Sequence, residues 1–132
     1  MVKVLFFLQI ILIGFIQDNN EQFNFVNEFM SKMLIGEDCV DYISKDYLRK
    51  NKLIGKKITN DFFLIKEFKI SKAENMKYNV AINTGKGGFC LLITIHLTFE
   101  EGKLYVYPSG YKEINQLNKV YITPWHDKKV VC

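Results

Sequence analysis

The residues best suited to acid–base chemistry gather in one stretch, where His96 is followed by Tyr105 and Tyr107. Imidazole and phenol groups are frequent general acids and bases in enzymes, and the imidazole titrates near neutral pH. Whether these three side chains can face a pocket depends on the strand that carries them.

That stretch reads as a long strand, a tight turn at Glu101-Gly102 and a second strand, because Gly tolerates the positive φ of a short hairpin turn. Side chains alternate between the two faces of a strand. The odd positions before the turn are apolar, namely Leu91, Ile93, Ile95, Leu97 and Phe99. A two-residue turn pairs Leu97 with Val106 and Phe99 with Leu104, so that the apolar residues of both strands share one face.

The same register puts the polar and aromatic residues together on the opposite, convex face. They are Thr94, His96, Thr98, Tyr105 and Tyr107. An apolar concave face argues against catalysis there, and we identify no catalytic residue. A face rich in Tyr and His is more typical of an interface, and it predicts a homodimer or a docked partner.

A second candidate for chemistry is the tripeptide Trp125-His126-Asp127. Adjacent His and Asp side chains seldom orient one another, and no Ser or Cys nucleophile is tied to them by spacing. We expect a surface tail over residues 124–132, with Trp125 covering an edge of the core.

The glycine-rich segment Thr84-Gly85-Lys86-Gly87-Gly88 could hold an anion through its backbone N–H groups. It lacks the spacing of a phosphate-binding loop, and no helix follows it. We interpret it as a mobile hairpin loop.

Three cysteines, Cys39, Cys90 and Cys132, match no metal-binding spacing, and nothing in the sequence calls for a metal or another cofactor. In an exported chain, one disulfide and one remaining thiol are expected. We predict a Cys90–Cys132 bridge, because it would fasten the C-terminal tail, and a buried free thiol at Cys39.

The N-terminus predicts export. Lys3 precedes an almost wholly apolar run from Val4 to Ile16, which is typical of a signal peptide and short for a membrane span. We predict a signal peptide over residues 1–17, cleaved near Gln17, and one domain over residues 18–132 of a secreted or periplasmic protein. An uncleaved membrane anchor is the alternative. The net charge is +4 but forms no basic stripe, which disfavours nucleic acid as a partner.

Helical periodicity predicts a first helix that starts at Asn19 or Asn20 and ends at Gly36. Its apolar stripe comprises Phe23, Val26, Phe29, Met30, Met33 and Leu34. A second helix is expected to start at Asp38, with Val40, Ile43 and Tyr47 facing inward and Asp41–Lys45 and Asp46–Lys50 ion pairs.

Further strands are predicted over Asp61–Ile70, from Tyr78 to Ile82, and over Lys119–Thr123. We expect a turn over Ser71–Met76, Ile82 opposite Phe89, and irregular chain over Tyr111–Asn118. The fold class is α+β, with N-terminal helices packed on a curved antiparallel sheet of about five strands.

Two segments resemble the nuclear transport factor 2-like (cystatin-like) cone family. They are the stretch from Gly36 to Leu48, similar to the second helix of that family, and the hairpin Glu101-Gly102-Lys103-Leu104. The resemblance implies a cone whose pocket opens on the concave face of the sheet. The family includes isomerases, dehydratases and cyclases beside many non-enzymatic modules, so the fold alone does not decide function.

We therefore expect an exported, non-enzymatic module that binds a partner or a small apolar ligand. The alternatives are an isomerase, dehydratase or hydrolase that uses His96 or His126, and a membrane-anchored accessory or inhibitor protein.

Overall fold

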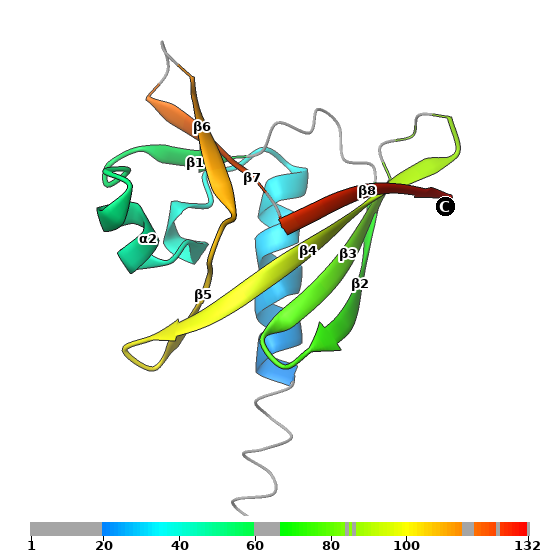
Figure 1. Cartoon of the computed structure of the whole chain (residues 1–132), viewed down its shortest axis with the longest axis horizontal. Helices are drawn as coiled ribbons and strands as arrows, with labels where there is room; N and C mark the ends of the chain where they lie inside the picture. Colours follow the sequence, from blue (N-terminus) through cyan, green and yellow to red (C-terminus); the bar gives the residue numbers. More distant parts are fainter. Residues whose placement is uncertain are drawn as a thin grey trace, which may run out of the picture.

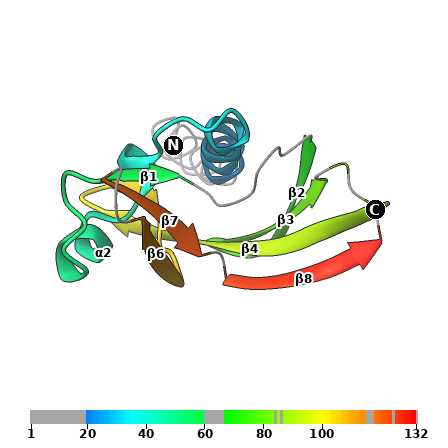
Figure 2. The same cartoon turned by 90° about the horizontal axis from the view of Figure 1, so that it is seen from above.

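A computed structural model describes residues 20–59, 67–83, 85, 87–114, 118–123 and 125–131 of the chain. Its main feature is a helix over residues 20–34 that lies along the hollow side of a strongly curled antiparallel sheet (Figure 1 and Figure 2). A smaller sheet and a short helix, α2 (Lys45–Lys50), lie beside that unit. The α+β class predicted from the sequence is confirmed. The predicted signal peptide over residues 1–17 lies outside the described residues.

The first helix buries one stripe of apolar side chains against the sheet. The stripe consists of Val26, Phe29, Met30 and Met33. Gly36 ends the helix as predicted, because its φ of +73° allows its N–H to reach the carbonyl of Met33 and the N–H of Glu37 to reach that of Lys32. Phe23, expected in the stripe, is 44% exposed. The inward position one turn before Val26 belongs to Gln22 instead, since residues four apart share a helix face.

Gln22 is a buried polar residue that fastens this helix to the turn between strands β2 (Glu67–Glu74) and β3 (Lys77–Asn83). Its Oε1 accepts hydrogen bonds of 3.3 Å from the Met76 N–H and from the hydroxyl of the buried Tyr78. Its amide nitrogen donates to Asn75 Oδ1 at 3.2 Å. The buried amide and the buried phenol therefore satisfy each other, as groups removed from water must.

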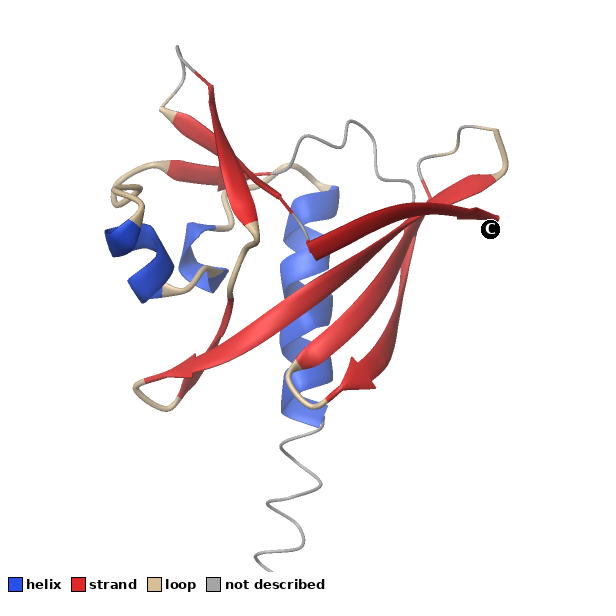
Figure 3. Ribbon diagram, in the orientation of Figure 1, coloured by secondary structure: helices blue, strands red, loops and turns tan. Residues whose placement is uncertain are grey.

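The main sheet has the order β2-β3-β4-β5, with β4 spanning Phe89–Glu100 and β5 spanning Lys103–Val106. Leu97 pairs with Val106 and Phe99 with Leu104, which confirms the predicted register of the β4–β5 hairpin. The edge of β4 opposite β3 is shared, since β8 (Trp125–Val131) pairs with its first half and β5 with its second. β4 thus pairs with three strands of this sheet, namely β3, β5 and β8, while β2 joins the sheet through β3 (Figure 3).

Two details of the predicted strands are wrong. β2 continues through Ser71 to Glu74, so the predicted turn shrinks to Asn75 and Met76; the polar residues stay extended because their backbone pairs with β3. Ile82 lies opposite Leu91 rather than Phe89. The shift is two residues, so it preserves the buried face. The start of the predicted Asp61–Ile70 strand lies outside the described residues.

The smaller sheet has the order β1-β7-β6, in which β1 (Lys57–Thr59) runs parallel to β7 (Lys119–Thr123) and β6 (Gly110–Ile114) runs antiparallel to it. The strand predicted over Lys119–Thr123 is confirmed as β7, but it is not the last strand, since β8 follows it. The prediction of irregular chain over Tyr111–Asn118 is wrong for residues 111–114, because they belong to β6, which pairs with β7. The tail expected over residues 124–132 is also wrong, because residues 125–131 form β8.

The predicted second helix is interrupted. A 3-10 turn spans Val40–Tyr42, and α2 starts only after Ser44. Between them Ile43 forms a parallel bridge to Val106, and the Ser44 N–H donates to the Val106 carbonyl at 2.9 Å. Pairing with the end of β5 therefore replaces one helical turn. The predicted Asp41–Lys45 pair loses its helical spacing as a result, and the ion pair found in α2 joins Asp46 to Arg49.

Candidate functional site

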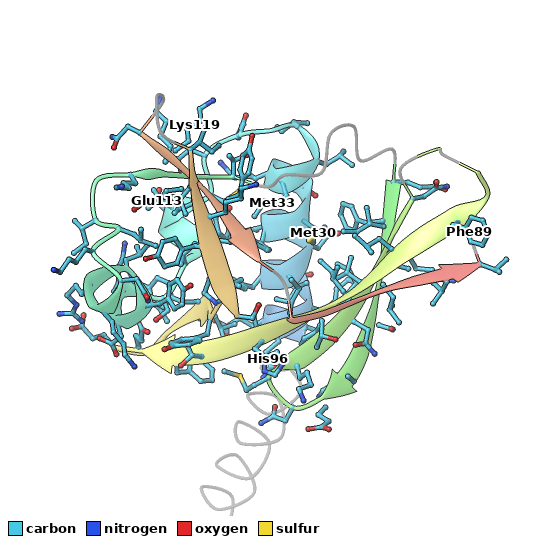
Figure 4. All side chains as sticks on the ribbon, turned by 45° about the horizontal axis from the view of Figure 1, so that its top comes forward. Met30, Met33, Phe89, His96, Glu113 and Lys119 are labelled. Carbon is cyan, nitrogen blue, oxygen red and sulfur yellow. The ribbon has the colours of Figure 1, made fainter. Side chains whose placement is uncertain are left out.

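His96 lies on the face of β4 that points away from the first helix. Its neighbours Ile95 and Leu97 are buried in the core, whereas His96 is half-buried on the other side of the strand. Figure 4 shows its place on β4. The parity predicted from the sequence is therefore confirmed, and His96 does not enter the space between helix and sheet.

The tyrosines expected at an interface contact α2 instead. The Tyr107 ring meets the Tyr47 ring edge-on, with centroids 5.2 Å apart, and Tyr111 meets Tyr47 in the same way at 6.4 Å. Lys45 Nζ lies 5.9 Å from the centroid of Tyr105. Much of the aromatic area on this face is thus used within the chain, because α2 folds across it.

Thr94 and Thr98 also belong to the predicted interface residues. Thr94 and Thr98 are both half-buried, and the Thr94 hydroxyl donates to Asn79 Oδ1 at 3.2 Å. The open part of the convex face is consequently smaller than the sequence suggested.

A carboxylate from the β4–β5 hairpin caps α2. The Ser44 hydroxyl donates to Glu100 Oε2 and accepts from the Tyr47 N–H at 3.1 Å. The Lys45 N–H donates to Glu100 Oε1 at 2.7 Å. Ser44 three residues before Tyr47 is an N-cap signal that sequence reading could have found, but nothing in the sequence links it to Glu100.

We expect Ser44→Ala to lower the free energy of unfolding by about 1–2 kcal/mol, since it removes the cap and leaves Glu100 without its hydroxyl partner. Ser31→Ala is the matched control, because Ser31 is exposed in the last turn of the first helix and its hydroxyl donates to the Asn27 carbonyl of the same helix. Chemical denaturation measures both variants. Equal stability of the two would contradict the role assigned to Ser44.

A groove of about 650 Å³ lies between α2 and the end of the β4–β5 hairpin. Two apolar side chains on its wall are exposed, Phe99 by 53% and Ile54 by 64%. Phe99 was expected in the core, but the hairpin extends past the first helix and leaves its tip uncovered (Figure 1). Six charged residues also line the groove, namely Asp41, Asp46, Glu100, Glu101, Lys45 and Arg49.

In the part of the chain that the structure describes, buried side chains occupy the hollow side of the main sheet, where a cone-type pocket would open. Val80, Ile82, Ile93 and Ile95 are all buried there and belong to one core cluster with the stripe of the first helix. Figure 4 shows Met30 and Met33 on that helix. Other cavities lie at the surface, one of about 600 Å³ beside the start of the first helix and one of about 410 Å³ over β2, β3, β4 and β8.

Three buried titratable groups of the described chain have raised pKa values, which keeps them protonated at neutral pH. Burial raises the pKa of the Cys39 thiol to about 12, with a further contribution from Asp38, and it raises the pKa of the Tyr47 phenol to about 12. Burial also raises the pKa of Tyr78. Cys39 is a buried free thiol, as predicted, at the N-cap of the 3-10 turn. Within the described ranges, no group of three or more His, Cys, Asp and Glu residues could hold a metal ion.

The other candidates fall partly outside the described residues. Trp125, His126 and Asp127 belong to β8, but their side chains are not described. In the glycine-rich loop, Thr84 and Lys86 lie outside the described residues, and the Gly85 N–H is bonded to Asn83 Oδ1 at 2.8 Å. That amide is therefore already satisfied within the loop.

Cys132 also lies outside the described residues. Its predicted partner Cys90 is buried in β4, directly opposite Val130 of β8.

None of the described helices is long and apolar enough to cross a membrane. The chain matches no protein-family model, no curated protein and no solved structure.

Proposed function

We propose that this chain is an exported, non-enzymatic binding module, and that it binds its partner in the groove between α2 and the β4–β5 hairpin. One observation carries the proposal: two large apolar side chains, Phe99 and Ile54, are exposed on the wall of a groove of about 650 Å³. Exposed apolar side chains grouped in a concavity and rimmed by charges are typical of interaction sites.

The filled core supports a binding role over catalysis. A substrate pocket inside a cone needs free space on the hollow side of the sheet, and that side is occupied by buried Val and Ile side chains packed with the first helix. Four of the described titratable groups are poor candidates for a general base. The described thiol and phenols with shifted pKa values, Cys39, Tyr42, Tyr47 and Tyr78, are all shifted upward, away from neutral pH. A general base needs a pKa near the working pH.

Export and the Cys90–Cys132 bridge form part of the same proposal. The apolar run from Val4 to Ile16 supports export, and the pairing of Val130 with Cys90 brings the C-terminal residues alongside β4. A helix held in a curled antiparallel sheet is also in keeping with the proposed relation to the nuclear transport factor 2-like cone.

A second copy of the chain is a further proposed partner, through the part of the convex face that carries Thr94, His96 and Thr98. Light scattering of the purified chain tests this. A monomeric mass at high protein concentration would exclude the homodimer without affecting the groove.

The groove is tested by selecting random twelve-residue peptides on the immobilised protein and measuring the enriched peptides against variants. We expect Phe99→Ala to weaken their binding about tenfold or more, since buried aromatic anchors dominate interfaces. Phe89→Ala is a closely matched control, because Phe89 also lies on β4 and is likewise 53% exposed. No enrichment, or equal weakening by both variants, would overturn the proposal.

A further inference from the structure

The charges around the groove point to the chemistry of its occupant, and this inference rests on the proposed binding function. The chain as a whole carries a net charge of +4. The groove has the opposite sign of charge, because four carboxylates and two cations line it.

Both cations are already engaged by neighbouring groups. An Arg49 nitrogen lies 2.5 Å from Asp46 Oδ1, and Lys45 Nζ lies over the Tyr105 ring. A ligand that entered the groove as an anion would therefore compete with existing contacts.

The carboxylates divide into two kinds. Glu100 is engaged with the start of α2, and Asp46 is paired with Arg49. Asp41 and Glu101 take part in none of the ion pairs found among the described residues. These two carboxylates are thus available to a ligand cation, on the same groove as Phe99 and Ile54.

We propose that the groove binds a short peptide segment in which apolar side chains are flanked by lysine or arginine. The apolar side chains cover Phe99 and Ile54, and the flanking cations meet Asp41 and Glu101. Complementary charges of this kind fix register and select among partners that share the same apolar anchor. A groove of about 650 Å³ accommodates a few side chains, in the range of about 300–1,000 Å³ typical of ligand sites.

The test uses three six-residue peptides labelled with a fluorophore and measured by fluorescence anisotropy at low salt. The first has Leu-Phe flanked by two lysines on each side, the second has the same pair flanked by glutamates, and the third keeps the lysines but replaces the apolar pair by alanines. We expect the first peptide to bind at least tenfold more tightly than either of the others, and to weaken as salt is added.

Variants assign that binding to the groove. We expect Asp41→Asn combined with Glu101→Gln to weaken binding of the lysine-flanked peptide about five- to tenfold. Glu28→Gln combined with Glu74→Gln changes the net charge equally at exposed positions outside this groove and should leave binding unchanged. Phe99→Ala should weaken the peptide about tenfold.

The outcomes separate this inference from the proposed function. If the glutamate-flanked peptide binds as well as the lysine-flanked one and both depend on Phe99, the charge inference is wrong and the binding groove stands. If the lysine-flanked peptide does not bind, or binds independently of Phe99, the inference is also wrong, and the random-peptide selection decides separately whether the groove binds peptides.

Discussion

Replacing Phe29 by alanine is expected to lower the free energy of unfolding by about 3–5 kcal/mol. Phe29 is only 1% exposed, and the centroid of its ring lies 6.0 Å from the centroid of the Tyr42 ring. Removing the ring loses its burial and leaves a cavity between the helix and the sheet. Such a loss is a large share of the stability of a small domain, which is about 5–15 kcal/mol.

Phe23→Ala is the control for this prediction, because Phe23 lies on the same helix but is 44% exposed. We expect a loss of less than about 1 kcal/mol, since most of its ring contributes no burial. Urea denaturation followed by circular dichroism measures both variants. If Phe23→Ala proved as damaging as Phe29→Ala, the helix would have to present a different face to the sheet.

The second large effect concerns the proposed bridge between Cys90 and Cys132. Breaking it by reduction, or by Cys132→Ser, should lower the free energy of unfolding by roughly 4 kcal/mol, because the bridge closes a long loop and restricts the unfolded chain. Cys132→Ser is preferred to Cys90→Ser, because Cys90 is buried and a serine there adds a packing cost. Reduction should not change the stability of the Cys132→Ser variant, because this variant has no bridge to break.

Alkylation and mass spectrometry give an independent measurement. Burial raises the pKa of the Cys39 thiol to about 12, so this thiol stays protonated at pH 8. Because the thiolate is the form that reacts, the folded, unreduced protein should take up no alkyl group. Unfolding without reductant should add one group, at Cys39, and unfolding with reductant should add three. Three additions without reductant would show that the bridge is absent.

Several elements could be predicted because their signals are local. The strict alternation along β4 and the Glu101-Gly102 turn fix the pairing of Leu97 with Val106, since a slip of one residue would expose the whole apolar set. Gly36 marks the end of the first helix for a similar reason, as a glycine readily adopts the positive φ that this cap needs. The face on which His96 lies follows from the same alternation.

The candidate groove could not be predicted, because its parts come from distant segments. The sequence around α2 reads as one continuous helix, and only pairing of Ile43 with Val106 interrupts it. Glu100, at the far end of β4, then caps α2. Phe99 is exposed because the β4–β5 hairpin extends beyond the first helix.

The sequence by itself determined the α+β class, the inward face of β4 and the end of the first helix, because periodicity and glycine conformation act over a few residues. Only the tertiary structure decided that polar segments such as Ser71–Glu74 and residues 125–131 are strands, and that α2 covers Tyr105 and Tyr107. The physical reason is that an extended backbone needs hydrogen-bond partners. A strand edge elsewhere in the fold can supply these partners, even to residues whose side chains have little preference for strands.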